Sequence, residues 1–490
     1  MPQPSGVGPV QKGSSAMLWR HLCLVRAWAA AGLVGGTICL SGPAATGQSP
    51  ANVPGGPPVS ARRVVGDEPS APPSGLATDT LDILQAGKTG ELSVVVHGHG
   101  QDRVRMTLRN GGKRRLNVVI PPGLVAASRV AQAGAGGGGG GRGGLQSIGL
   151  GSVTNRPGAF GEFQADGPAG GLRSVPVTGE PGSRAIAVPA GESIDVSITG
   201  ICLNYGRPAP TPRDTLTLVD VNTYTEDPRI RKALRTLATV GTSHGVAQAV
   251  MWNLCSDLPF EQMTDQSGKV FNATEVALAA RFVEALGDST DSEATIPASA
   301  FADSRIVVKV EGQGALAEDA RRLNAKMDGM RVLGLPVKAV EGDTAPPCSA
   351  PALGIRVILT SAQTAETRAR IVVSTMGPSG SWVSLGHTGF HEPSSISVVD
   401  GPTLARAIDR AVSGAFVTVK PSRRVVGATT LRLENRLPFT ITSVVVRAGN
   451  SSGAPTVPFE AVGLGPARSA LLPLQAASAS LVEHVALNGL

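Results

Sequence analysis

Strict alternation of apolar and polar residues is the feature of this sequence that most restricts its fold. In RVRMTLRN (residues 103–110), Val104, Met106 and Leu108 fall on one face of an extended chain, and arginine and threonine occupy the other. This period of two is typical of strands that bury a single face in an antiparallel sheet. Similar strands, bounded by turn residues, are ELSVVVHG, RRLNVVIPPG and RAIAVPAGESIDVSITG. We therefore expect an antiparallel β-sandwich over residues 77–212.

A glycine-rich insertion interrupts this first module. Residues 132–173 include six consecutive glycines at 136–141. Glycine loses more conformational entropy on ordering than any other residue and offers no side chain for packing. We expect this insertion to be mobile.

The strand pattern occurs a second time near the end of the sequence. MTLRNGGKRRLNVVIPPG resembles LRLENRLPFTITSVVVRAG, and VPAGESIDVSI resembles LGPARSALLPL further along each module. Asn110 and Asn435 hold equivalent places, and asparagine is common in turns because it tolerates positive φ. The pattern predicts a weak internal repeat and a second β-sandwich-like module over residues 422–490.

Helical spacing dominates the region between the two modules. Apolar residues three and four apart in DPRIRKALRTLATV, VAQAVMWNLC and NATEVALAARFVEAL predict a helical segment over residues 213–300. Residues 301–421 show strands and helices in the order β-α-β-β-α-β, which predicts a small α+β unit with a ferredoxin-like layer. The fold class is thus a multidomain, β-rich α+β protein with two sandwich modules flanking these parts.

The first residues have the order of a secretory signal peptide. Basic residues precede an apolar stretch from Ala27 to Leu40, and small residues follow it. We expect a signal over residues 1–47, cleaved after Ala45 or Gly47, and then a disordered Pro/Gly/Ser linker over residues 48–76. No later apolar run is long enough to span a membrane, so we expect a secreted, periplasmic or cell-envelope protein without a membrane span after signal removal.

Export also permits disulfides. Three cysteines follow the expected signal: Cys202, Cys255 and Cys348. Cys202 and Cys255 would close a loop of moderate length as a disulfide, and three buried or reduced thiols fit the sequence equally well.

Charge restricts the class of partner. The formal net charge is +7, but the arginines are scattered and no basic run carries interleaved aromatic residues. We therefore expect no nucleic-acid binding.

The stretch GTSHG (residues 241–245) fits the Gly-x-Ser-x-Gly motif of serine hydrolases. A nucleophile elbow requires a buried strand just before the serine, whereas RKALRTLATV has helical spacing. We expect a joint between two helices, with Gly241 ending one and Thr242 or Ser243 capping the next. The alternative is a secreted esterase-like hydrolase using Ser243, with His387, His391 or His484 as its base.

Two histidine pairs have spacings that metal ligands can adopt. His97 and His99 lie two apart at a strand end, and no third ligand follows at a recognisable spacing. His387 and His391 in HTGFHE are four apart, which suits zinc on a helix, but the neighbouring Gly and Pro residues favour a loop. We expect no metal and no cofactor, with His97 and His99 as the alternative metal site.

Three segments together resemble a loosely defined group of uncharacterised exported bacterial proteins. They are residues 90–125, VPAGESIDVSITGICLNYGRPAP and HGVAQAVMWNLCSD, and they cover about residues 80–265. The resemblance implies a β-sandwich followed by a helical Gln-x-Ala-x-x-Trp-like segment, here Gln248, Ala249 and Trp252, and implies no known activity. Trp252 also fits a helix face packed on a sheet.

From these observations we expect an exported, non-enzymatic binding or scaffold protein of the cell envelope or exterior. Its partner would be a protein or an envelope component, and the sequence does not identify it. The serine hydrolase remains the alternative.

Overall fold

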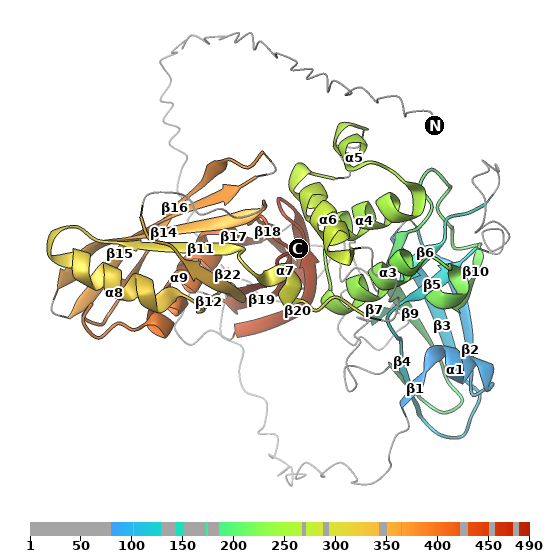
Figure 1. Ribbon diagram of the computed structural model, residues 1–490. Helices are drawn as coiled ribbons and strands as arrows, with labels where there is room; N and C mark the ends of the chain where they lie inside the picture. Colours follow the sequence, from blue (N-terminus) through green and yellow to red (C-terminus); the bar gives the residue numbers. More distant parts are fainter. Residues whose placement is uncertain are drawn as a thin grey trace, which may run out of the picture. The chain divides into compact units, whose positions relative to one another are not determined.

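The structure is a computed structural model that describes residues 80–100, 102–128, 144–150, 173–174, 186–266, 271–287, 294–342, 350–363, 365–377, 379–421, 430–449, 456–473 and 480–490 (Figure 1). All of them belong to one compact unit, residues 75–490. The expected signal peptide and linker lie outside the described residues. The fold is a strand-rich α+β fold with several sheets, as the sequence predicts.

Six strands of the first module close into a ring. Their order is β3 (Arg103–Asn110), β2 (Leu92–Gly98), β10 (Thr215–Asp220), β5 (Leu124–Ala127), β6 (Ile148–Leu150) and β9 (Ser193–Cys202), and β9 pairs again with β3. The short β7 (Arg173–Ser174) adds to β9. Val104, Met106 and Leu108 are fully buried inside, as their alternation predicts.

A second, smaller sheet accompanies the ring. It contains β1 (Thr80–Asp82), β4 (Leu116–Val119) and β8 (Ile186–Val188). The helix α1 (Ile83–Lys88) begins at Asp82, whose side chain accepts the N–H of Leu84 at 2.7 Å. The two-sandwich arrangement is therefore not confirmed, because closure through β3 and β9 replaces two open facing sheets.

Part of the glycine-rich insertion is ordered, contrary to our expectation. Residues 144 and 146–150 are buried, and β6 pairs with both β5 and β9. The six glycines at 136–141 lie outside the described residues. β10 also lies where the sequence predicts the start of the helical segment, although its TLTL alternation is that of a strand.

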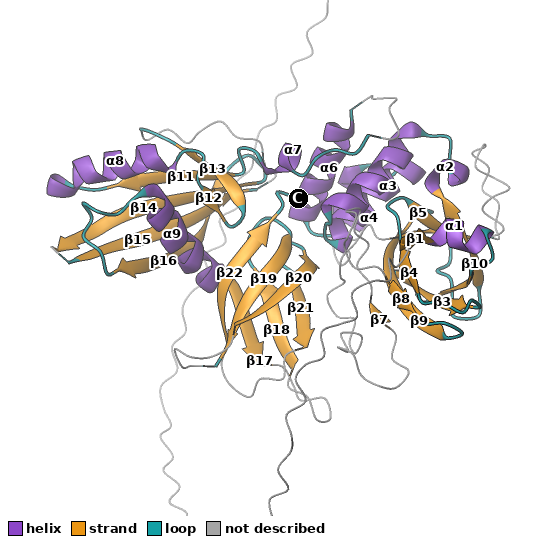
Figure 2. Cartoon of the chain, turned by 90° about the horizontal axis from the view of Figure 1, so that it is seen from below, coloured by secondary structure: helices purple, strands orange, loops and turns teal. Residues whose placement is uncertain are grey.

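Helices follow the ring, as predicted. They are α2 (Val221–Tyr224), α3 (Pro228–Val240), α4 (His244–Ser256), α5 (Phe260–Gln266), α6 (Ala273–Leu286) and α7 (Ser299–Ala302) (Figure 1 and Figure 2). Helix α3 begins with Pro228 after the capping residue Asp227. No helix among the described residues combines the length and apolar character needed to cross a membrane.

The α+β unit contains a six-stranded mixed sheet. Its order is β12 (Arg331–Val332), β13 (Leu335–Ala339), β11 (Ile306–Glu311), β14 (Ala352–Gln363), β15 (Glu366–Met376) and β16 (Trp382–Glu392). A 3-10 turn, η2 (Gly314–Leu316), leads into α8 (Ala317–Met327), and α9 (Gly401–Phe416) follows β16. The expected β-α-β-β-α-β order is not realised, because β16 is an additional strand and β17 (Val417–Pro421) pairs in another sheet.

The C-terminal module consists of two three-stranded sheets. One is β17, β18 (Thr430–Asn435) and β21 (Ser469–Pro473), and the other is β20 (Thr456–Leu464), β19 (Ile441–Ala448) and β22 (Ser480–Leu487). Leu431, Leu433, Ile441 and Val485 belong to a core cluster that also includes residues of the helical segment and the α+β unit.

The internal repeat is present in the pairing registers of the two modules. Leu92 lies opposite Asn110, and Val417 lies opposite Asn435. The remaining equivalent pairs are Arg109–Ser193 with Glu434–Ser469, and Leu116–Val188 with Ile441–Leu464. In both modules these pairs lie at the same positions relative to the asparagine and to the strand that follows it.

The two asparagines that mark the repeat make the same hydrogen bonds. The side-chain amide of Asn110 donates to the carbonyl oxygens of Arg114 (2.8 Å) and Val188 (3.0 Å), and its oxygen accepts the N–H of Gly112 (2.9 Å). Asn435 likewise donates to the carbonyl four residues later (2.8 Å) and to that of Leu464 (3.1 Å), and accepts the N–H two residues later (2.9 Å). Both side chains are buried, so these bonds fix the turn between two strands.

Candidate functional site

Ser243 lies in a joint between two helices. It is the N-cap of α4, and its hydroxyl accepts the N–H of Val246 at 3.4 Å. Gly241 ends α3 with a φ of 68°. The hydroxyl group is not on a strand-to-helix turn, and Ser243 is only 2% exposed. This is the helix joint that the sequence predicts.

The second glycine of GTSHG has a steric role. A β-carbon on Gly245 would overlap the carboxylate of Glu275, which belongs to the first turn of α6. Glu275 is 1% exposed, and one of its oxygens accepts the N–H of Asn272 at 3.0 Å in a capping box. The motif therefore allows a buried carboxylate to approach the start of α4.

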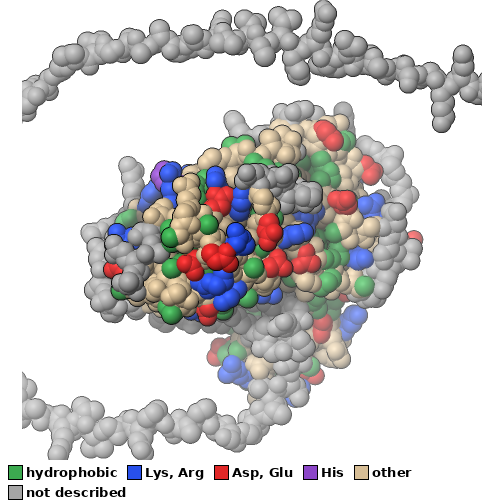
Figure 3. All heavy atoms as spheres, turned by 60° about the vertical axis from the view of Figure 1, so that its left-hand side comes forward, with side chains coloured by type: hydrophobic (Ala, Val, Ile, Leu, Met, Phe, Trp, Pro, Cys, Tyr) green, Lys and Arg blue, Asp and Glu red, His purple; other side chains and the backbone are tan. Residues whose placement is uncertain are grey.

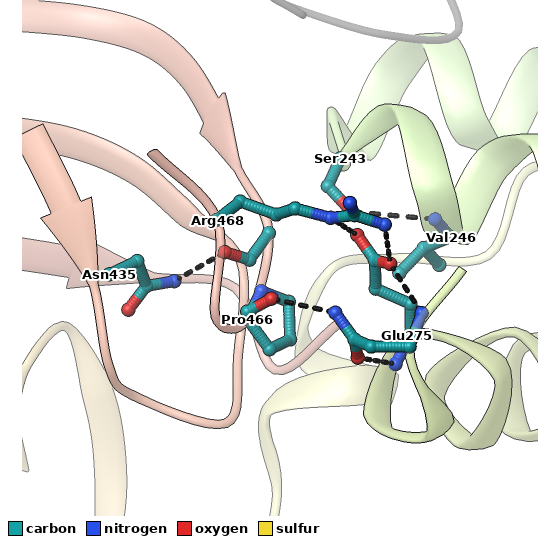
Figure 4. Close-up of polar contacts among 8 residues, drawn as sticks. Ser243, Val246, Glu275, Asn435, Pro466 and Arg468 are labelled. Atoms are coloured by element: carbon teal, nitrogen blue, oxygen red, sulfur yellow. Dashed lines mark hydrogen bonds and ion pairs between the residues drawn. The ribbon is translucent and has the colours of Figure 1, made fainter. Parts of the chain in front are cut away.

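An arginine from the C-terminal module neutralises this carboxylate. Arg468, in the turn before β21, donates from Nε to Glu275 at 3.0 Å and also from its terminal nitrogen (Figure 4). The hydrogen bond with Glu275 raises the pKa of Arg468. Asn272 donates to the carbonyl of Pro466 at 2.9 Å, so the turn is held at two points. A paired, buried carboxylate beside a capping serine is a structural junction rather than a nucleophile with its base.

The histidines proposed as the base in the alternative occupy other elements. His484 lies on β22 and its Nδ1 is 2.9 Å from a carboxylate oxygen of Asp409 on α9. The hydrogen bond to Asp409 raises the pKa of His484, and burial opposes the shift. Among the described residues, Ser243 accepts hydrogen bonds from the N–H groups of Val246 and Ala247, and none of the three candidate histidines is its partner.

His387 and His391 lie on an exposed strand, β16, and not in the expected loop. They fall on the same face of the strand, with Gly389 between them on that face, and are paired with Val372 and Arg368 of β15. His391 is 3.0 Å from Glu366. The prediction of a loop from the neighbouring glycines was wrong, because Gly386 has a φ of 142° that accommodates a β-bulge within the strand. His97 lies on β2 and His99 follows its end. Within the described residues no group of three His, Cys, Asp or Glu side chains could hold a metal ion.

Cys202 and Cys255 are thiols and do not form a disulfide. Burial raises the pKa of the Cys255 thiol to about 12, so it is protonated at neutral pH. The side chain of Gln248 on α4 accepts the N–H of Cys202 at 2.9 Å and donates to its carbonyl at 2.7 Å. The glutamine of the Gln-x-Ala-x-x-Trp segment therefore joins the helical segment to the end of β9.

Trp252 on α4 packs against aromatic neighbours. Its ring meets those of Tyr205 and Phe271 edge to face, with centroids 4.7 and 5.4 Å apart. This geometry is typical of a core contact.

A groove that the sequence analysis did not identify opens between α1, β2 and β10. Its volume is about 400 Å³, within the range of ligand sites. Apolar side chains form most of its walls, and Lys88 and two threonines of β10 lie at its edge. On β2, Val95 is 40% exposed to solvent, although it is apolar. The residues that line it are Ile83, Leu84, Gly87, Lys88, Val94, Val95, Val96, Thr215, Leu216, Thr217 and Leu218.

The groove exists because the ladder between β2 and β10 is broken. Only two residue pairs connect these strands, His97–Thr215 and Val96–Leu216. From Thr217 onwards β10 remains paired with β5 alone. The two strands therefore separate at this point.

Hydrogen-bond alternation shows which peptide groups face the groove. The N–H of Gly98 donates to the carbonyl of Asp214 at 3.1 Å, so even-numbered residues of β2 direct their peptide groups toward β10. On β10 the same alternation leaves the even-numbered residues facing β2, since the N–H of Val221 donates to Gly123 on the other side at 2.9 Å. The peptide groups of Val94 and Leu218 consequently face the groove from opposite walls without a ladder partner.

No family model, curated protein or solved structure matches this chain.

Proposed function

We propose that this protein is an exported, non-enzymatic binding protein that holds an extended peptide in the groove between α1, β2 and β10. The broken ladder carries the proposal, because it leaves strand edges with hydrogen-bonding groups on both walls of an apolar groove. Export rests on the signal-like order of the first 47 residues. The shared hydrogen bonds of Asn110 and Asn435 support the finer proposal that both modules are variants of one sandwich type.

Backbone pairing identifies the class of ligand. An extended peptide would exchange N–H and C=O bonds with Val94 on one wall and Leu218 on the other, as in strand addition to a sheet edge. Alternate side chains would enter the apolar space beside Ile83 and Leu84. Lys88 at the rim suits a carboxylate at the end of the peptide.

Gly87 provides a direct test, because it lines the groove and a β-carbon there would contact nothing within 4 Å. Gly87→Phe should fill the groove, whereas Gly87→Ala should only stabilise α1 by roughly 0.5–1 kcal/mol and serves as the control. The probe is an acetylated tetrapeptide of alternating threonine and valine with a free carboxylate, and binding is measured by calorimetry.

We expect Gly87→Ala to retain binding and Gly87→Phe to abolish it. A peptide methylated at its backbone nitrogens should bind at least about fivefold more weakly, because each lost hydrogen bond is worth about 1 kcal/mol. Equal binding of the methylated peptide would show that strand pairing is not involved. Binding that survives in Gly87→Phe would place the site elsewhere.

The serine hydrolase alternative depends on a free hydroxyl at Ser243, and this hydroxyl caps α4. The wild type should hydrolyse a panel of esters no faster than the uncatalysed background, and Ser243→Ala should not change this rate. The substitution should lower the stability by about 1 kcal/mol, because it removes the N-cap of α4. Turnover by the wild type that is lost in Ser243→Ala would establish the hydrolase and contradict our proposal.

A further inference from the structure

One face of the α+β sheet is covered by helices and the other is not. Helices α8 and α9 pack against each other and against one face, where Val308, Ile355 and Ile371 are buried. Side chains of the alternate positions, such as Arg356 and Arg370, are exposed. We call this second surface the open sheet face, and it is formed by β12, β13, β11, β14 and β15 with β16 at its edge.

Basic residues dominate the open sheet face. The pairing registers bring Lys309 beside Arg356 and place Lys338 one strand away, opposite Val307. Its six basic side chains are Arg331, Lys338, Lys309, Arg356, Arg368 and Arg370, and its two acidic ones are Glu311 and Glu366. Figure 3 shows one face of the molecule, on which basic and acidic side chains are interspersed.

The two carboxylates are already engaged by neighbours on the same face. Glu311 is 2.7 Å from Lys309 and 2.5 Å from Arg356. Glu366 is 3.1 Å from Arg368 and 3.0 Å from His391. Arg370 and Lys338 have no acidic partner among the described residues. The face therefore keeps a positive charge that its own acids do not neutralise.

The open sheet face has little aromatic surface for stacking bases. Trp382 is the aromatic residue that the described strands bring to it, and its ring lies against Gly354. Binding of bare bases normally relies on several exposed aromatic rings. One guanidinium group can donate two parallel hydrogen bonds to the oxygens of one phosphate group. Four of the six basic residues are arginines.

We propose that the open sheet face binds a linear phosphodiester polymer that lacks bases, such as a polyol phosphate. This surface is separate from the peptide groove, and the proposal does not depend on it. Binding is electrostatic, so it releases counterions and weakens as salt is added.

The experiment compares two double variants of equal net charge in the full chain. Lys338→Gln with Arg370→Gln changes the open sheet face. Arg321→Gln with Lys326→Gln changes exposed positions of α8 on the covered side and is the control. Poly(glycerol phosphate) is the probe, and its affinity is measured over a series of salt concentrations.

We expect the open-face variant to lose about tenfold in affinity at low salt, with a salt slope reduced by roughly one to two units, and the control to match the wild type. Equal losses in both variants would show an effect of net charge alone and overturn the proposal. Equally tight binding of polyglutamate would overturn the preference for phosphate. Tighter binding of single-stranded DNA would make the face a nucleic-acid surface instead. Absence of binding by the wild type would also refute it.

Discussion

At the scale of single residues, one ion pair couples a strand of the C-terminal module to a helix of the α+β unit. His484 on β22 contacts Asp409 on α9, and a second oxygen of Asp409 accepts the N–H of Leu333 at 2.8 Å. The hydrogen bond to Asp409 raises the pKa of His484 above its usual value. The imidazolium form is therefore favoured by folding.

This raised pKa predicts how stability depends on pH. Because the folded pKa lies above the unfolded one, the contribution of His484 is fully present below about pH 6.5 and is lost as the pH rises through the folded pKa. His484→Gln should therefore be less stable than the wild type at pH 5.5, and the difference should shrink at pH 8.5. Urea unfolding at both values measures this, and a difference that grows with pH would contradict the assignment.

At the scale of elements, the repeat places a left-handed residue in the same turn of each module. Gly191 has a φ of 70° before β9, and Ala467 has a φ of 53° before β21. Glycine adopts this conformation without a steric penalty, whereas alanine does not. The second module thus contains strain that the first one avoids.

Exchanging the two residues should change stability in opposite directions. Gly191→Ala should destabilise the protein by about 1 kcal/mol, and a β-carbon there would contact nothing within 4 Å, so the cost is one of backbone conformation. Ala467→Gly should stabilise it by up to about 1 kcal/mol. Thermal unfolding measures both. Shifts of the same sign would mean that the two turns are not equivalent.

Patterns within a short stretch of sequence predicted those features that depend on interactions between residues close in the sequence. The alternation around Met106 and the capping role of Ser243 depend on neighbours in the sequence. The repeat was visible because Asn110 and Asn435 each also bond the turn two and four residues later. β16 was missed because Gly386 and Gly389 are unusual in a strand, and the long partner strand β15 supplies its stability. The groove could not be predicted, since it depends on where β10 leaves β2, which is a property of two strands far apart in sequence.

At the scale of the whole molecule, the contact between Arg468 and Glu275 joins residues that are 193 positions apart. It connects the helical segment with the C-terminal module, and the amide of Asn488 adds a second connection through the carbonyl of Gly241. Removing one partner of a buried pair leaves an uncompensated charge, which typically costs 3–5 kcal/mol. The two parts should therefore unfold together.

Arg468→Met tests this coupling, because it leaves the buried carboxylate of Glu275 without its partner. We expect a loss of about 3 kcal/mol, while Lys420→Met, which breaks the exposed pair with Glu434, should cost less than about 1 kcal/mol. Adding Glu275→Gln to Arg468→Met should recover much of the loss, because the charge is then absent. Two tryptophans follow the expected cleavage site, Trp252 in α4 and Trp382 in β16. Single-tryptophan versions therefore report separately on the helical segment and on the α+β unit, whose helix α9 packs against β22 of the C-terminal module. Both should show the same shift in urea midpoint, and a shift confined to Trp252 would mean that the helical segment unfolds independently.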